Sequence, residues 1–216
     1  MIIALDGPSG TGKSTLAKIL AKKLGFKMLN TGMIYRAITY YYVKKSIKAD
    51  SQEVVSSIGN LNIKIVFFGN DQNVFIEGEN ITPFVSNVEV QKNVSLFSQI
   101  LEIRQRVNVI QREFANKNNI VIEGRDIGTD VFPNAEYKFY VVCDTITRAK
   151  RRLADLNSIN QQITLDEVIK SLQERDHLDT TRKYGPLRKA EDAIEIDTTN
   201  STINESLNEI LSQIKF

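Results

Sequence analysis

The sequence predicts an α/β fold: a doubly wound, mostly parallel sheet with a small inserted β-hairpin subdomain and a helical lid. Three observations lead to this prediction. A phosphate-binding motif lies between a short apolar run and a helical pattern at the start of the chain. Further short apolar runs then alternate with helical patterns, as in doubly wound sheets. One stretch alternates with a period of two, which a parallel sheet of βα units does not need.

The composition sets the limits of the problem. A chain of 216 residues fits one domain, residues 1–216, with an inserted subdomain. Its hydrophobic content of 42% is enough for a core, and its net charge of +2 gives no reason to expect nucleic-acid or membrane binding. No apolar stretch approaches the roughly 18 residues of a membrane span. We expect no signal peptide, because the first residues already form a strand and a loop.

The single cysteine, Cys143, ends an apolar run and is expected to be buried in a strand. A lone cysteine cannot form an intramolecular disulfide, which fits a reducing compartment. We therefore expect a cytoplasmic protein.

The motif at the start of the chain carries the first chemistry. Residues Met1–Leu5 are an apolar run short enough for a buried strand. The next residues, the phosphate loop, match the pattern G-x-x-x-x-G-K-[ST]: Gly7, Pro8, Ser9, Gly10, Thr11, Gly12, Lys13 and Ser14. Apolar residues at helical spacing follow, at Leu16, Ile19, Leu20 and Leu24. The motif therefore lies between the strand and the helix that it requires.

The residue types of the phosphate loop explain its chemistry. Its glycines permit backbone angles and close approaches that a Cβ would block. The backbone N–H groups can then cradle a polyphosphate at the positive end of the following helix. Lys13 can bridge the β- and γ-phosphates, and the Ser14 hydroxyl can ligate Mg²⁺. An ordinary glycine-rich turn would not need the Lys-Ser ending.

The next segments lead to the insert. We expect a strand at Phe26–Leu29, a turn at Asn30–Gly32 and a helix over Met33–Val43. Apolar and polar residues then alternate from Leu61 to Phe67, Gly69–Asp71 reads as a turn, and a second strand contains Val74–Ile76. These features predict a β-hairpin, and residues 60–83 form the core of the expected subdomain.

The second half continues the alternation. Residues Val88–Phe114 read as helical with a break near Leu101, and the apolar run Ile120–Ile122 reads as a strand buried on both faces. The charged stretch Glu123–Thr129 follows that strand, at the sheet edge where open α/β folds bind ligands. The remaining expected elements are a strand at Tyr137–Cys143, a basic helix at Thr147–Leu156, a polar loop at Asn157–Gln162, a helix beginning at the capping box Thr164–Glu167, a strand at Ala193–Ile196 and a helix beginning at the capping box Thr202–Glu205.

The phosphate loop alone is compatible with a GTPase, an ATPase motor or a kinase. The string nearest to the guanine-reading Asn-Lys-x-Asp, residues 116–119, lacks the acid and precedes a strand. Arginines near element ends or in loops favour a kinase whose acceptor is a phosphate, because guanidinium groups match phosphate oxygens and an ionised acceptor needs no general base. They are Arg36, Arg104, Arg125, Arg151, Arg175 and Arg182. A kinase acting on a hydroxyl stays open, since Asp126 is available as a base.

Four strings together resemble the bacterial cytidylate kinases, across nearly the whole chain. They are Asp6–Thr15, Thr31–Arg36, Gly124–Thr129, and Glu174–Asp176 with Asp179 and Arg182. The resemblance implies a P-loop kinase fold in which residues 157–186 form the lid and the hairpin insert helps to bind the nucleoside monophosphate. It also implies transfer of the γ-phosphate of ATP to CMP or dCMP with Mg²⁺. Separately, we expect a monomer whose partners are these small molecules.

The resemblance also assigns roles by motif position. ATP is expected on the phosphate loop and the residue after it, Thr15, with Arg151 against the adenine and Ser14 on the metal. The CMP phosphate is expected on Arg36, Arg125 and Arg182, the cytosine on Ser95, Arg104 and Asp126, and the sugar on Arg175 and Asp179. The catalytic charges are those of Lys13, Arg125, Arg175 and Arg182.

The chain departs from the family pattern at three places. Thr31 stands where the family usually has serine, which keeps a hydroxyl for the substrate. Glu123 replaces an aspartate, which puts its role in ordering metal-bound water in question, and Leu101 replaces a proline before Arg104. Two other functions remain: a kinase for another monophosphate or small metabolite, and a nucleotide-binding protein without turnover. The basic helix that contains Arg148 and Arg152 favours the latter, and the near-neutral net charge argues against nucleic-acid binding.

Overall fold

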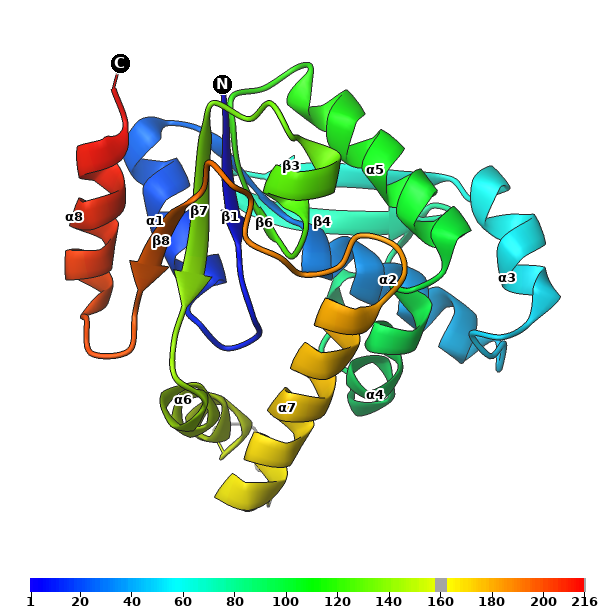
Figure 1. The fold of residues 1–216 in the computed structure, drawn as a ribbon. Coiled ribbons are helices and arrows are strands. Elements are labelled where there is room, and N and C mark those ends of the chain that lie inside the picture. Colours follow the sequence, from blue (N-terminus) through cyan, green and yellow to red (C-terminus); the bar gives the residue numbers. More distant parts are fainter. Residues whose placement is uncertain (158–162, 216) are drawn as a thin grey trace.

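The computed structural model describes residues 1–157 and 163–215. Its centre is a five-stranded sheet in the order β2-β6-β1-β7-β8, in which every pairing is parallel (Figure 1). The strands are β1 (Ile2–Asp6), β2 (Lys27–Asn30), β6 (Ile120–Gly124), β7 (Tyr137–Val142) and β8 (Ile194–Asp197). Asp6, the last residue of β1, pairs with Gly124 and with Tyr140, so the carboxyl ends of three strands lie at one edge.

Helices cover both faces of this sheet. Because successive side chains of a strand point to opposite faces, β1 contributes to two cores. Ile3 and Leu5 pack in one core with α1 (Lys13–Leu24) and α8 (Ile203–Gln213). Ala4 packs in the other with α2 (Thr31–Lys44) and α5 (Leu101–Ala115), on the opposite side in Figure 1. The predicted doubly wound α/β fold is confirmed.

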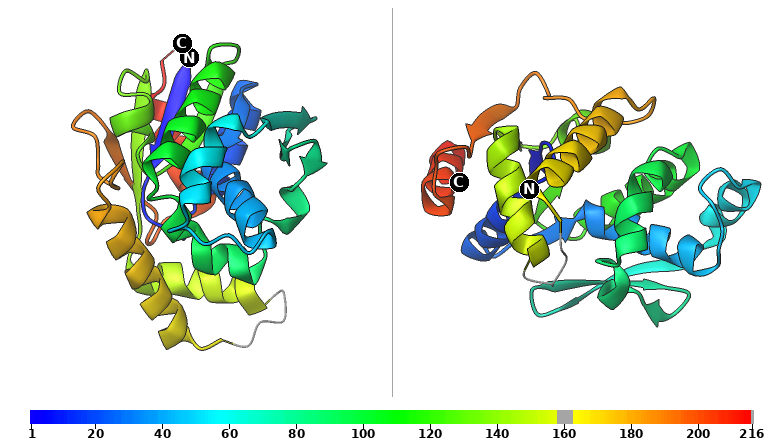
Figure 2. Two further views of the ribbon diagram at one scale, coloured as in Figure 1. Left: turned by 90° about the vertical axis from the view of Figure 1, so that its right-hand side faces the viewer. Right: turned by 90° about the horizontal axis from the view of Figure 1, so that it is seen from below.

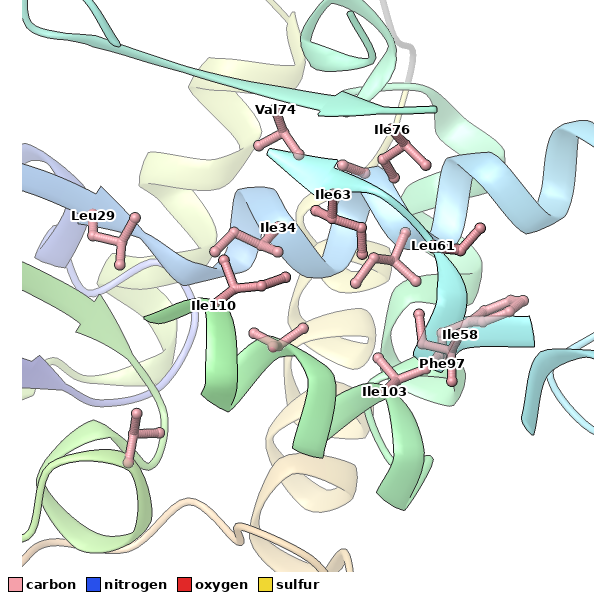
Figure 3. Packing of buried hydrophobic residues seen from close by; sticks show 14 of the residues in the cluster. Leu29, Ile34, Ile58, Leu61, Ile63, Val74, Ile76, Phe97, Ile103 and Ile110 are labelled. Carbon is pink, nitrogen blue, oxygen red and sulfur yellow. The ribbon is translucent and has the colours of Figure 1, made fainter. Parts of the chain in front are cut away.

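The inserted segment is a small antiparallel sheet. It contains β3 (Ile63–Phe68), β4 (Asp71–Ile76) and β5 (Glu79–Asn80). The prediction of a two-stranded hairpin was therefore incomplete: the chain turns at Glu77 and Gly78, both with positive φ, and returns as a third short strand. The two-residue length of β5 left no period-two pattern in the sequence. Figure 3 shows Ile63 and Val74 of this sheet beside Ile34 of α2, within the same core.

Helix α3 (Gln52–Ser57) and the 3₁₀ turns at Ile58–Asn60 and Thr82–Phe84 border the insert. Helix α4 (Val88–Phe97) ends before α5 begins at Leu101, which confirms the predicted break. Helices α6 (Thr145–Asn157) and α7 (Leu165–Thr181) pack on each other at the side where the strands end (Figures 1 and 2). Both capping boxes are formed. Residues 158–162 of the predicted polar loop lie outside the described residues.

Two local predictions were wrong. Thr31 and Gly32 are not in a turn but begin α2, because the Asn30 side chain caps this helix by accepting a hydrogen bond from the Met33 amide at 2.8 Å. Cys143 is half-buried and lies just beyond β7, which ends at Val142.

Among the described helices, none has the length and hydropathy that crossing a membrane requires.

Candidate active site

A cavity of about 580 Å³ lies at the carboxyl ends of the parallel strands. The phosphate loop, α2, α4, the residues after β6, and helices α6 and α7 contribute to its wall. Its volume is in the range of small-molecule sites. The cationic side chains in the wall outnumber the acidic ones: Lys13, Arg36, Arg125, Arg151, Arg152, Arg175 and Arg182 against Glu123, Asp126, Asp155 and Asp179. This excess of positive charge suits an anionic ligand.

The conformation of the phosphate loop depends on two of its glycines. Gly7 has φ 146°, and a Cβ there would lie 2.1 Å from the Val141 carbonyl oxygen in the neighbouring strand. Gly12, with φ 87°, is the left-handed N-cap residue of α1. Only glycine adopts such angles without strain, so the loop can turn directly from β1 into the helix. The amino end of α1 is thereby directed at the cavity, as anion binding requires.

Lys13 is buried at the base of this loop, with 4% of its surface exposed. Its Nζ donates hydrogen bonds to the Pro8 carbonyl and, at 3.2 Å, to Thr11 Oγ1. The pKa of Lys13 is lowered to about 7, chiefly by burial and also by the charge of Arg125, whereas the charges of Glu123 and Asp6 oppose the shift. A phosphate group beside Lys13 would favour its charged form, because an opposite charge raises the pKa of an amine.

Ser14 of α1 and Glu123 of β6 contact each other at the edge of the sheet where the strands end. The Ser14 hydroxyl donates a hydrogen bond of 2.8 Å to Glu123 Oε1. Ser14 is exposed, whereas Glu123 is buried. A hydroxyl and a carboxylate are hard oxygen donors of the kind Mg²⁺ binds in nucleotide sites. The longer side chain of Glu123 therefore reaches Ser14, the predicted metal ligand. The two side chains together fit a Mg²⁺ ion that is bound to the phosphates of a nucleotide.

Two buried carboxylates organise the arginines on the opposite wall. Asp126 pairs with Arg104 and, at 3.4 Å, with Arg182. Asp179 pairs with Arg125 at 2.8 Å and with Arg182 at 3.5 Å. Arg182 therefore joins α7 to the segment after β6. Burial raises the pKa of Asp126, and the charges of Arg104 and Arg182 oppose this rise.

Other predicted arginines lie in the cavity with fewer counter-charges. Burial lowers the pKa of Arg175 to about 10, and Arg125 adds to the effect. The Nε atom of Arg175 is buried without a hydrogen-bond partner among the described residues. Burial also lowers the pKa of Arg36, which lines the same wall from α2. Both guanidinium groups are placed to bind anionic oxygens.

The remaining predicted residues lie as follows. Thr31 is buried and donates to the Glu123 carbonyl at 2.8 Å, so its hydroxyl is used within the protein. Arg151 donates to the Thr198 carbonyl at 2.7 Å, at the end of the cavity nearest α8. Ser95, on α4, and Thr15 line the cavity. Three of the predicted site residues do not line the cavity: Arg104, Gly7 and Pro8. Arg104 is 3% exposed, and its ion-pair partner Asp126 lines the cavity in its place.

The sequence did not single out Asp6 as a site residue. This carboxylate, at the end of β1, accepts hydrogen bonds from the backbone amides of Ile127 at 3.0 Å and Gly128 at 2.7 Å. Burial raises its pKa to about 7. Asp6 thus fixes the segment that carries Arg125 and Asp126 relative to the phosphate loop. The signals in the sequence were its place between a buried strand and the motif and its place at the start of the string Asp6–Thr15.

Comparison with known proteins identifies the family of the chain. The family model "Cytidylate kinase" matches residues 3–216. A cytidylate kinase of Clostridioides difficile is 42% identical over 214 residues, which cover 99% of this chain and 98% of that protein. One of Fusobacterium nucleatum is 39% identical over 216 residues, covering 100% and 97%.

A solved structure of an uncharacterized protein from Eubacterium ventriosum has a TM-score of 0.53 at 14% identity, covering 98% of this chain and 96% of that one. This last likeness concerns the fold alone. The family model and the relatives extend over the sheet, the insert and helices α6 and α7. On this ground the chain belongs to the cytidylate kinase family, and it is a kinase.

Proposed function

We propose that this kinase transfers the γ-phosphate of ATP to CMP or dCMP, giving ADP and CDP or dCDP. The observation that carries the proposal is the arrangement of charge in one cavity. Lys13 and the phosphate loop form one wall, and Arg36, Arg125, Arg175 and Arg182 approach from the other elements. Two anionic groups can therefore meet between them, which is what phosphoryl transfer between two nucleotides needs.

The carboxylates favour a phosphate acceptor over a hydroxyl. Each of the three buried carboxylates in the cavity wall is engaged: Glu123 by Ser14, Asp126 by Arg104 and Arg182, and Asp179 by Arg125 and Arg182. A general base for an alcohol needs a carboxylate free to accept its proton. A phosphate acceptor is already ionised, so the enzyme needs only to position it and to stabilise charge.

We assign the roles as follows. Lys13, Arg125, Arg175 and Arg182 stabilise the charge of the transferring group, as positively charged clamps do in phosphoryl transfer. Arg36, Arg125 and Arg182 hold the phosphate of CMP, whereas Arg175 and Asp179 hold its sugar. Ser95, Asp126 and, behind it, Arg104 select the base. Arg151 lies against the adenine of ATP, which the phosphate loop and Thr15 bind.

Mg²⁺, which would be held by Ser14 with Glu123 beside it, supplies charge neutralisation of the β- and γ-phosphates when bound. The hydroxyl of Ser14 would exchange its bond to Glu123 for one to the metal. Glu123, held by β6, would stay within reach of the water molecules that Mg²⁺ keeps. We also propose that residues 60–83 and 157–186 act as substrate-binding insert and lid of one domain, and that the enzyme is a monomer, since one chain provides every group in these assignments.

Turnover of a substrate panel tests the proposal. ADP formation from ATP is measured with CMP, dCMP, UMP, AMP and a small hydroxy acid in turn. CMP and dCMP should give the highest kcat/KM. Preference for another monophosphate, or for the hydroxy acid, would support the alternative that the enzyme is a kinase for another monophosphate or small metabolite. Binding of ATP without turnover of any acceptor would support a non-catalytic nucleotide-binding protein.

We expect substrate to protect the lid from proteolysis. Closure over the phosphates would exclude water that otherwise hydrolyses ATP, and the lid should open when no ligand is bound. Trypsin can cut at exposed lysines on and after α7, such as Lys170 and Lys183. CMP with a non-hydrolysable ATP analogue should slow cleavage at these lysines severalfold but leave cleavage at the exposed Lys117 of the core unchanged. Mass spectrometry of the fragments gives both rates, and equal lid cleavage with and without ligands would contradict this expectation.

A further inference from the structure

Helix α6 carries three arginines on one face, at Arg148, Arg151 and Arg152. Residues separated by three and four positions lie on the same side of a helix. Arg151 and Arg152 line the cavity, but Arg148 does not. Arg148 is nevertheless the most buried of the three, with 5% of its surface exposed, and none of the roles proposed above uses it. A buried guanidinium group must find partners, because leaving its charge unpaired is costly.

The partners of Arg148 come from the phosphate loop and from the lid. Its Nη1 donates to the Ser9 carbonyl at 3.1 Å and to Asp176 Oδ2, on α7, at 2.6 Å. Its Nη2 donates to Thr145 Oγ1 at 3.1 Å. A Cβ added to Gly10 would lie 3.3 Å from the Arg148 Cβ, so the loop and α6 are in close contact here.

The bond to Ser9 determines where the next amide points. In a planar trans peptide, the carbonyl and the following N–H point in opposite directions. With the Ser9 carbonyl fixed on Arg148, the Gly10 N–H is directed away from α6. The same device recurs two residues later, where Thr198 Oγ1 donates to the Thr11 carbonyl at 2.9 Å and thereby directs the Gly12 N–H. The carbonyls of Ser9 and Thr11 are thus both held by side chains from outside the loop.

The bond to Asp176 connects this arrangement to the lid. Asp176 follows Arg175 directly and precedes Asp179 by three residues, so its position fixes the rotation of α7 that directs both of these side chains into the cavity. We propose that Arg148 is a positioning residue that holds the Ser9–Gly10 peptide in its phosphate-binding orientation and couples it to α7. This inference rests on the proposed function for the identity of the ligands. The alternative is a buried ion pair that only stabilises the fold.

Binding of ADP and of inorganic tripolyphosphate, measured by calorimetry, tests the first half of the proposal. Arg148→Met should weaken both ligands by roughly tenfold, since it removes the charged hydrogen bond that orients the loop. Arg148→Lys keeps a donor for the Ser9 carbonyl, so it should weaken both ligands by only about twofold to threefold. Lys150→Met removes the same charge from the exposed face of α6 and should change neither affinity.

A merely structural role predicts a different pattern. The melting temperature would fall in Arg148→Met while ADP and tripolyphosphate still bind within twofold of wild type, and this result would overturn the proposal. If Arg148→Met does not fold, Arg148→Lys decides alone: a measurable loss of tripolyphosphate affinity, twofold to threefold, supports the proposal, and unchanged affinity overturns it. These binding measurements use no acceptor, so they stay informative even if wild type does not phosphorylate CMP.

Asp176→Asn tests the coupling to α7. It keeps an oxygen acceptor for Arg148 but removes the charge, so the phosphate loop should still bind ADP within twofold of wild type. The KM for CMP should rise severalfold, because Arg175 and Asp179 lose their fixed position. A KM for CMP within twofold of wild type would overturn the link between Arg148 and the lid.

Discussion

Replacing Lys13 with alanine is expected to reduce kcat for CMP phosphorylation by roughly a hundredfold or more. Loss of one preorganised charge contact to a developing transition state commonly costs about 3 kcal/mol. Lys13 is prepared for this role by its environment: it is buried, and it donates to Pro8 and Thr11 within its own loop. Its pKa is lowered to about 7, chiefly by burial. Phosphate groups beside Lys13 would raise this pKa and so favour the charged form of the lysine.

Steady-state kinetics with CMP and UMP measure this effect. Lys13→Ala should depress both substrates in equal proportion, because the lysine acts on the phosphates common to them. Lys22→Ala removes a charge from the exposed side of the same helix and serves as the matched control. Circular dichroism confirms that each variant is folded. Turnover of Lys13→Ala within threefold of wild type would remove this lysine from the mechanism.

Asp126→Asn is expected to abolish most of the preference for CMP over UMP. Cytosine has an amino donor where uracil has a carbonyl acceptor, so an ionised carboxylate suits only cytosine. The amide of asparagine can donate to the uracil carbonyl instead. The ratio of kcat/KM for CMP and UMP should fall by about 1–3 kcal/mol, or roughly ten- to a hundredfold, since a mismatched site leaves buried polar groups unpaired.

The structure explains why asparagine is the better substitution than alanine. Asp126 is 4% exposed and lies between Arg104 and Arg182, so alanine would leave two buried guanidinium groups with neither a counter-charge nor a hydrogen-bond acceptor at this position. Breaking a buried pair in this way typically costs about 3–5 kcal/mol of stability. Asparagine also removes the charge, but it keeps the size of the side chain and one oxygen acceptor for the arginines. If Asp126→Asn lowers kcat/KM for CMP and UMP equally, Asp126 does not select the base, and its role is to position the two arginines.

Local patterns in the sequence were enough for much of the fold. Apolar runs at β1 and β6 predicted strands buried on both faces, and both capping boxes predicted the starts of α7 and α8. Such signals work because they depend on neighbours within a few residues. The sequence predicted less well an element whose start depends on one capping side chain and an element of only two residues. The Asn30 cap moved the start of α2 to Thr31, and the two residues of β5 were too few to show a period.

The sequence also determined which residue types form the active site, because the phosphate loop and the arginine strings have characteristic spacings. Only the tertiary structure decided how their charges are paired. Asp126 meets Arg182, 56 residues away, and Arg148 meets Ser9, 139 residues away. No spacing along the chain encodes such contacts, since they arise where the strand ends and helices α6 and α7 converge. For the same reason the net charge of +2 gave no sign of a cavity rich in cations, because the packing of the elements, and not the composition, concentrates the arginines there.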